Sequence, residues 1–155
     1  MSLNSFFKKT FIFQGDIQSA DDLSQVIQQL KNGLTTRSCV LLKGDLAAGK
    51  TTFVQKFCES YGITSVSSPT FSLHHEYKNT GLFVDHFDLY RLTSVEEIDT
   101  CGLWESFDKP SGLIFIEWPE RISENELPKD WDYFELNLKV KNENERFISL
   151  CGFFR

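Results

Sequence analysis

The chain has 155 residues, of which 41% are hydrophobic and 25% are charged, and its formal net charge is -6. These proportions are typical of a globular domain in water, and the length suits a single domain with a sizeable core over residues 1–155. A general nucleic-acid surface would need a basic stripe, so the negative charge predicts no direct sequence-specific nucleic-acid binding.

Membrane and secretory signals are missing from the sequence. No apolar stretch approaches the roughly 20 residues of a membrane span, and residues 1–9 lack the apolar core of a signal peptide. The cysteines are far apart, without metal-binding spacing, as expected for free thiols in a reducing compartment: Cys39, Cys58, Cys101 and Cys151. We therefore expect a cytoplasmic protein with no membrane partner.

Apolar periodicity predicts alternating strands and helices along the chain. In chain order, we expect a short strand at 11–13, a helix that begins near Ser19 or Asp21 and ends at Asn32-Gly33, a buried strand at 39–42, a helix over 53–61, strands at 70–77 and 82–88, a short helix after Ser94, a buried strand from Gly112 to Glu117-Trp118, and strands at 134–140 and 146–153. Ser94 and Glu97 have the spacing of a capping box.

A phosphate-binding loop is the clearest motif. Gly44-Asp45-Leu46-Ala47-Ala48-Gly49-Lys50-Thr51-Thr52 fits the spacing G-x-x-x-x-G-K-[ST]. In such a loop, backbone N–H groups and the positive end of the next helix bind phosphate oxygens. Lys50 would reach the β- and γ-phosphates, the Thr51 hydroxyl would complete a Mg²⁺ shell, and Thr52 would donate to the α-phosphate. The alternative is an accidental match within a turn, which the flanking strand and helix disfavour.

The position of this loop suggests a fold class. In open α/β sheets, ligands bind at the carboxyl ends of the strands, where this loop lies. The element order therefore predicts an α/β fold of the P-loop NTPase type: a mostly parallel sheet with antiparallel strands added and helices on both faces. The two predicted hairpins, at 70–88 and 134–153, would supply the antiparallel strands.

Two acidic residues are candidates to complete the site. Glu117 closes the apolar strand 113–116 and is the candidate for the acid near the metal; a solvated residue at a strand end is the alternative. Asp88 shares a strand face with His86 and would orient the attacking water or hold a metal-bound water, while Arg91 would pair with Asp88 or touch phosphate. A surface ion pair beside a buried histidine explains the same spacing.

Hydroxyl groups gather in a third segment, Ser67-Ser68-Pro69-Thr70. A loop of this kind would sense the γ-phosphate as a switch. Its composition alone indicates only a turn.

Together these segments resemble one family. The phosphate loop 44–52, Ser68-Pro69-Thr70-Phe71, His86-Phe87-Asp88-Leu89-Tyr90-Arg91-Leu92 and Ile116-Glu117-Trp118-Pro119-Glu120 occur in the order and spacing of the TsaE (YjeE) family. The likeness spans about residues 16–121. A phosphate loop is widespread, whereas the His-x-Asp-Leu-Tyr-Arg and Glu-Trp elements are far more specific.

The resemblance implies an ATPase of bacterial tRNA threonylcarbamoyladenosine biosynthesis, with ATP and Mg²⁺ as cofactors. Such proteins hydrolyse ATP weakly alone and act on a complex of TsaB and TsaD, which modifies adenosine 37 of tRNA; hydrolysis would reset that complex between turnovers. Contact with tRNA would therefore be indirect. Carried over by position, the catalytic residues are Lys50, Asp88 and Glu117, the Mg²⁺ ligands are Thr51 and Glu117, and the nucleotide contacts are Asp45, Leu46, Ala47, Ala48, Gly49, Lys50, Thr51, Thr52, Glu117, Trp118, Pro119 and Glu120.

The sequence departs from the family pattern at one position. Ala47 stands where the family usually has glycine, so this position must accept a Cβ, and we expect its φ to be negative. The change leaves Lys50 and Thr51 in place. The last thirty or so residues carry no matched motif, so no contacts are assigned there.

Two other functions stay open. A small-molecule kinase of the P-loop type would bring an Arg-bearing lid onto the phosphoryl group, but this chain has no arginine cluster, and phosphate release without an acceptor would exclude that function. Its arginines are Arg37, Arg91, Arg121, Arg146 and Arg155. A nonenzymatic nucleotide-dependent binding module would bind a partner equally with ATP and with a non-hydrolysable analogue, without turnover.

Overall fold

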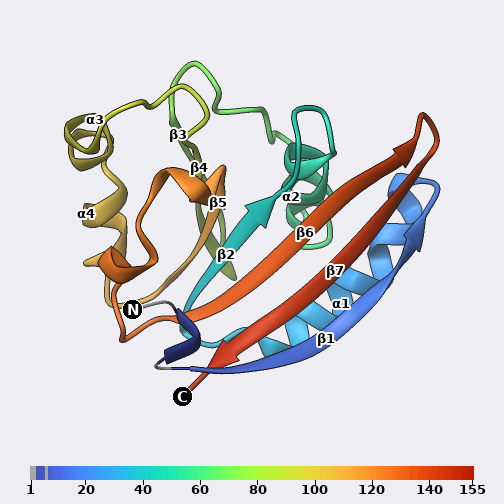
Figure 1. Ribbon diagram of the computed structural model, residues 1–155, viewed down its shortest axis with the longest axis horizontal. Coiled ribbons are helices and arrows are strands. Elements are labelled where there is room, and N and C mark those ends of the chain that lie inside the picture. Colours follow the sequence, from blue (N-terminus) through green and yellow to red (C-terminus); the bar gives the residue numbers. More distant parts are fainter. Residues whose placement is uncertain (1–2, 6) are drawn as a thin grey trace.

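The structure, a computed structural model, describes residues 3–5 and 7–155. A seven-stranded mixed sheet runs through this part of the chain in the order β1-β7-β6-β2-β5-β4-β3, with helices on both faces (Figure 1). Among the described residues, no helix has the length and apolar character needed to cross a membrane.

The elements follow the predicted alternation, but the first strand covers residues 8–17 where 11–13 was expected, and a helix at 103–107 was not predicted. The strands are β1 (Lys8–Ile17), β2 (Arg37–Lys43), β3 (His74–Asn79), β4 (Leu82–Asp88), β5 (Gly112–Glu117), β6 (Asp132–Asn142) and β7 (Glu145–Phe154). The α-helices are α1 (Leu23–Gly33), α2 (Lys50–Glu59), α3 (Val95–Thr100) and α4 (Leu103–Phe107). Short 3-10 helices are η1 (Leu3–Ser5), η2 (Ala20–Asp22), η3 (Pro119–Arg121) and η4 (Glu124–Glu126).

Strand direction confirms the predicted parallel core with antiparallel additions. Strand β2 is parallel to β5 and β6, and β5 is parallel to β4. The antiparallel pairs are β3 with β4, β6 with β7, and β1 with β7. In Figure 1 the long β6–β7 hairpin and β1 curve together along one side of the molecule, away from α3 and α4.

Alternation along the central strands builds two cores, one on each face of the sheet. On β2, Val40 and Leu42 join a core with α1 and α2, whereas Cys39 and Leu41 join a core with α3 and α4. Successive strand residues point to opposite faces, and a central strand covered by helices on both sides is apolar throughout. This explains why the sequence patterns of β2 and β5 are continuous apolar runs.

The predicted strand at residues 70–77 is wrong in its first part. The N–H of Leu73 donates to the carbonyl of Pro69 at 2.6 Å, and Leu73 has a φ of 67°, so residues 69–73 close a turn before β3 begins. Phe71, which the alternation had placed on a strand face, is 82% exposed. An alternating pattern records a period of two but does not show whether the apolar residues have a surface to cover.

The capping box that the sequence predicted is present at the start of α3. The hydroxyl of Ser94 accepts from the Glu97 N–H at 3.2 Å, and the Glu97 carboxylate accepts from the Ser94 N–H at 3.1 Å. These bonds satisfy two N–H groups that a helix start leaves without intrahelical partners.

We expect Ser94→Ala to lower the free energy of unfolding by about 1 kcal/mol, because it removes the cap acceptor. Ser24→Ala is the matched control, since Ser24 lies on an exposed face of α1, and alanine there should leave stability unchanged or slightly higher. Urea denaturation of both variants measures the difference. Equal stabilities would contradict the capping assignment.

Candidate functional site

Strand register brings the predicted site residues to one edge of the sheet. Leu42 of β2 and Asp88 of β4 are both register partners of Glu117 on β5. The phosphate loop follows β2 and leads into α2 (Figure 1). A cavity of about 460 Å³ lies there, lined by Leu46, Ala47, Ala48, Gly49, Lys50, Thr51, Thr52, Ser68, Thr70, Asp88, Glu117 and Trp118.

Backbone conformation explains why both glycines of the loop motif are glycine. Gly44 has a φ of 150°, and a Cβ there would lie 2.6 Å from the Leu138 carbonyl oxygen. Gly49 precedes α2 with a φ of 109°, and a Cβ there would meet nothing within 4 Å. The left-handed backbone favours glycine at both positions. Gly49 itself lines the cavity.

The backbone of Ala47 contradicts the sequence expectation. Its φ is 62°, in the left-handed region, whereas the presence of a Cβ had predicted a negative value. The physical reason is that the loop path fixes this conformation, and alanine tolerates it at a cost of roughly 1 kcal/mol. The loop therefore keeps a shape suited to glycine even where the sequence has alanine.

The side chain of Lys50 is folded back onto its own loop. Its Nζ donates to the carbonyls of Gly44 at 2.6 Å and Asp45 at 2.9 Å, and lies 4.3 Å from the centre of the Trp118 ring. Burial lowers the pKa of Lys50, and the charge of Glu117 opposes that shift most strongly. The ammonium group thus lies at the wall of the cavity, where phosphate oxygens would compete with the two carbonyls.

The side chains of Thr51 and Glu117 are in contact at the wall of the cavity. The Thr51 hydroxyl donates to Oε1 of Glu117 at 3.0 Å and to Oε2 at 3.1 Å, and Nε2 of His86 lies 3.0 Å from Oε2. Glu117 is 3% exposed, so the interpretation as a solvated strand end is wrong. A hydroxyl and a carboxylate are oxygen ligands of the kind that Mg²⁺ prefers, so these residues fit the ion.

Asp88 lines the same cavity and lies beside Glu117 on the neighbouring strand. Its Oδ2 accepts from the Thr70 hydroxyl at 2.8 Å and its Oδ1 from the Tyr90 N–H at 3.0 Å. Asp88 is buried, so the surface ion-pair interpretation is wrong. The guanidinium of Arg91 lies instead over the Phe71 ring, at 4.1 Å from its centre. The hydroxyl-rich loop and Asp88 are therefore in direct contact, which the sequence did not predict.

Three of the predicted nucleotide contacts lie outside the lining of this cavity. Asp45 contributes its carbonyl to Lys50. Pro119 and Glu120 line a separate cavity of about 220 Å³, together with Lys43. Their contact with a nucleotide stays a prediction.

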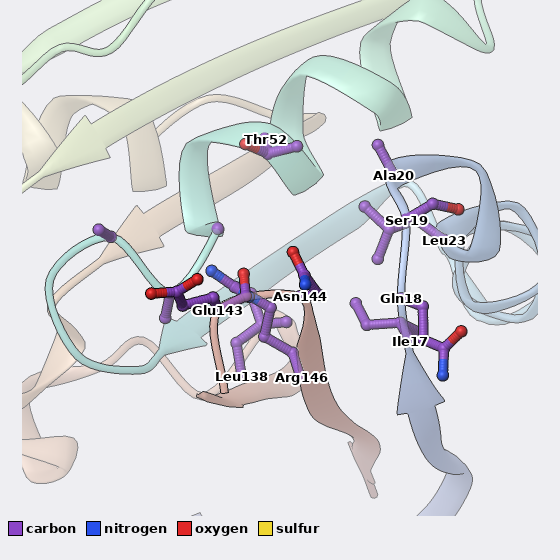
Figure 2. Close-up of a pocket in the computed structure, with 13 residues that line it drawn as sticks. Ile17, Gln18, Ser19, Ala20, Leu23, Thr52, Leu138, Glu143, Asn144 and Arg146 are labelled. Carbon is purple, nitrogen blue, oxygen red and sulfur yellow. The ribbon is translucent and has the colours of Figure 1, made fainter. Parts of the chain in front are cut away.

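Another cavity, of about 280 Å³, shares Ala47, Ala48, Gly49 and Thr52 with the cavity of about 460 Å³. Figure 2 shows the segment from Ile17 to Leu23 on one side, the β6–β7 turn with Glu143 and Asn144 across from it, and Thr52 on α2. Sequence reasoning had assigned Thr52 but missed the others, because residues 17–23 and the β6–β7 turn lie far from the loop in the chain. Its Asn-rich composition signalled a turn but not its distant neighbours.

Comparison with known proteins places the chain among relatives. The family described as "Threonylcarbamoyl adenosine biosynthesis protein TsaE" matches residues 17–148. The chain belongs to the TsaE family. Two relatives named tRNA threonylcarbamoyladenosine biosynthesis protein TsaE are similar to it. One, from Rickettsia felis, is 37% identical over 86% of this chain and 77% of its own. The other, from Nostoc, is 39% identical over 93% of this chain and 86% of its own.

A solved structure extends the likeness to the fold. The crystal structure of Bacillus subtilis YdiB superposes with a TM-score of 0.66 and 26% identity, over 94% of this chain and 86% of that one. The family resemblance read from the motifs is confirmed, and the family match reaches further along the chain than the motifs did. It includes β6 and part of β7, where no motif had been recognised.

We expect Ala47→Gly to leave the free energy of unfolding within about 0.5 kcal/mol of the original, because relief of the left-handed backbone offsets the entropy of glycine. The neighbouring Ala48→Gly is the control. Ala48 is buried and lies outside the positive-φ residues, so this change should lower the free energy by about 1 kcal/mol or more. Thermal unfolding of the pair tests the expectation, and equal losses would contradict it.

Proposed function

We propose that this protein is a Mg²⁺-dependent ATPase that supports tRNA threonylcarbamoyladenosine formation by acting on a complex of TsaB and TsaD. The observation that carries the proposal is the Thr51 hydroxyl facing the Glu117 carboxylate at 3.0 Å, at the end of a phosphate loop. Membership of the TsaE family supports the pathway. The buried acid and the loop support a nucleotide as the ligand.

The two cavities suggest how ATP would lie. The larger one holds the ammonium of Lys50 and the acids, and would take the β- and γ-phosphates. The cavity of about 280 Å³ lies on the other side of the shared loop residues and would take the nucleoside, with Thr52 between the two cavities. Polar groups on its walls, such as those of Ser19 and Asn144, would meet the ribose and base edges.

Thr51 and Glu117 would hold the metal ion, which when bound offsets the phosphate charge. The Lys50 ammonium would leave the carbonyls of Gly44 and Asp45 and bind the phosphates in a charge-assisted contact. Asp88 would orient the attacking water, because its carboxylate lines the same cavity and is fixed by Thr70. Lys50 would therefore release its present partners when the nucleotide binds, whereas Asp88 would keep its bond to Thr70.

The charge of the site supports dependence on a partner. Among the described residues that line the larger cavity, Lys50 is the single basic side chain. Efficient hydrolysis usually needs a further cation on the transition state, which another protein often supplies. Apolar side chains are exposed around the site: Phe71 is 82% and Leu46 is 66% exposed. These offer TsaB or TsaD a contact beside the phosphates, so we propose weak hydrolysis by the protein alone.

We expect substitution of Glu117 and substitution of Asp88 to change different properties of the protein. Glu117→Ala should reduce the Mg²⁺ dependence of ATP binding, since it removes a metal ligand. Asp88→Ala should leave ATP affinity within a few fold and lower phosphate release in the presence of TsaB and TsaD, by roughly tenfold or more, as is typical when a group that positions the nucleophile is lost. Calorimetry with and without Mg²⁺, followed by a phosphate-release assay, measures both effects.

Asp108→Ala provides the control for that pair, because Asp108 is an exposed acid outside the site. It should change neither quantity. If Asp88→Ala abolished Mg²⁺-dependent binding while Glu117→Ala did not, the two roles would have to be exchanged.

The proposed function is tested by phosphate release from ATP, by this protein alone and with purified TsaB and TsaD. We expect the partners to raise the rate by roughly tenfold or more, a barrier change of about 1.4 kcal/mol. Lys50→Ala should remove the stimulated rate. A non-hydrolysable ATP analogue should permit docking but stall repeated tRNA modification. Fast hydrolysis that ignores the partners would refute the proposal and favour an independent nucleotidase or kinase.

A further inference from the structure

A chain of hydrogen bonds links the hydroxyl-rich loop to Glu117, the acid proposed to hold the metal ion. The Tyr77 hydroxyl on β3 donates to the carbonyl of Ser67 at 2.8 Å and lies 3.3 Å from Nδ1 of His86 on β4. The other ring nitrogen of His86 lies 3.0 Å from Oε2 of Glu117. Tyr77 is 7% exposed and His86 is 0% exposed. The chain thus runs from the exposed residue Ser67 to β5, and its two inner bonds, at His86, are buried.

We infer that Tyr77 and His86 are positioning residues, which couple the conformation of the loop at Ser67 to the orientation of the Glu117 carboxylate. The inference rests on the proposed function, since it concerns how Glu117 is set for Mg²⁺. It assigns a role to the histidine of the His-x-Asp motif that differs from the role of its neighbour Asp88.

The two carboxylate oxygens of Glu117 differ in their contacts. Thr51 contacts both at nearly the same distance, 3.0 and 3.1 Å, so its hydroxyl alone leaves rotation about the last carbon–carbon bond weakly defined. His86 contacts Oε2 only. This one-sided bond distinguishes the two oxygens and fixes the plane of the carboxylate, and a metal ligand must be oriented within narrow limits to be effective.

Tyr77 fixes the histidine in turn. An imidazole ring held at one nitrogen can still turn about χ2, whereas one held at both nitrogens cannot. Burial raises the pKa of Tyr77 to about 12, so the hydroxyl keeps its single proton at neutral pH, and this proton is shared between the Ser67 carbonyl and Nδ1 of His86 while the Nε2–H of His86 donates to Glu117. His75 adds a second tie, with its Nδ1 at 3.2 Å from Oγ of Ser67. Displacement of the loop would therefore release Tyr77, and then His86.

The competing interpretation is a satisfied buried histidine that serves stability alone. Both interpretations predict some loss of stability when the chain is cut, so the test needs another readout. Tyr77→Phe keeps the ring and removes the hydroxyl. Tyr133→Phe is the matched control, because Tyr133 is also buried and its hydroxyl donates to the Pro128 carbonyl at 2.6 Å, in the core on the other face of the sheet.

The experiment is a Mg²⁺ titration of each protein saturated with a non-hydrolysable ATP analogue, followed by calorimetry. We expect Tyr77→Phe to weaken Mg²⁺ affinity roughly five- to tenfold, the range for loss of one hydrogen bond that supports a ligand, with Mg²⁺-free nucleotide affinity unchanged. Tyr133→Phe should leave both affinities unchanged. Hydrogen exchange of residues 67–72 in the nucleotide-free protein should rise in Tyr77→Phe and not in Tyr133→Phe.

Three negative outcomes are distinguishable. If the unaltered protein bound Mg²⁺ with the analogue and Tyr77→Phe bound it equally well, the coupling would be refuted and the proposed function would stand. If the unaltered protein took up no Mg²⁺ with the analogue, the proposed function would fail, and this inference with it. Equal loss of affinity in both variants would assign the effect to general destabilisation and would also refute the coupling.

Discussion

The register of three parallel strands is the constraint on which this site depends. Because β2, β5 and β4 run in the same direction, their carboxyl ends meet at one edge, and Leu42, Glu117 and Asp88 are aligned there. The loop can therefore begin immediately after β2 with the two acids already beside it. A shift of one residue would turn the carboxylate of Glu117 to the opposite face of the sheet, away from Thr51, because side chains alternate. The apolar packing on both faces that fixes this register thus also fixes the chemistry.

Buried charge explains why the polar contacts are so complete. Lys50, Asp88 and Glu117 are each at most 5% exposed. An ionised group taken out of water costs several kcal/mol unless it is paired or hydrogen-bonded. Two carbonyls hold the ammonium, Thr51 and His86 hold one acid, and Thr70 and a backbone N–H hold the other. Four of these six partners come from loops at the same edge, whereas Thr51 lies in the first turn of α2 and His86 lies within β4. The charged groups are therefore held by several elements that converge at this edge.

Sequence reasoning recovered what is local and missed what is brought together by folding. The strand–loop–helix around Lys50 and the acid after β5 follow from short patterns, because spacing alone places them. The link from Thr70 to Asp88 spans 18 residues and the link from His86 to Glu117 spans 31, and no periodicity reports such pairings. The strand expected from residue 70 failed for another reason: a local turn, closed by the bond from the Leu73 N–H to the Pro69 carbonyl, overrode the alternation.

Backbone conformation connects these observations. Among the described residues, the non-glycine positions with positive φ are Ala47, Leu73 and Trp118, and all three lie in the segments that border the larger cavity. Each such conformation costs of order 1–3 kcal/mol and persists only where the surroundings hold it. The Leu73 carbonyl accepts from the Asp88 N–H at 3.0 Å, and the Trp118 ring covers the Lys50 ammonium. The positive φ of each residue therefore accompanies a contact to a charged site residue or to the phosphate loop itself. Backbone strain is concentrated where the site needs fixed geometry, and the two apolar cores stabilise the fold against it.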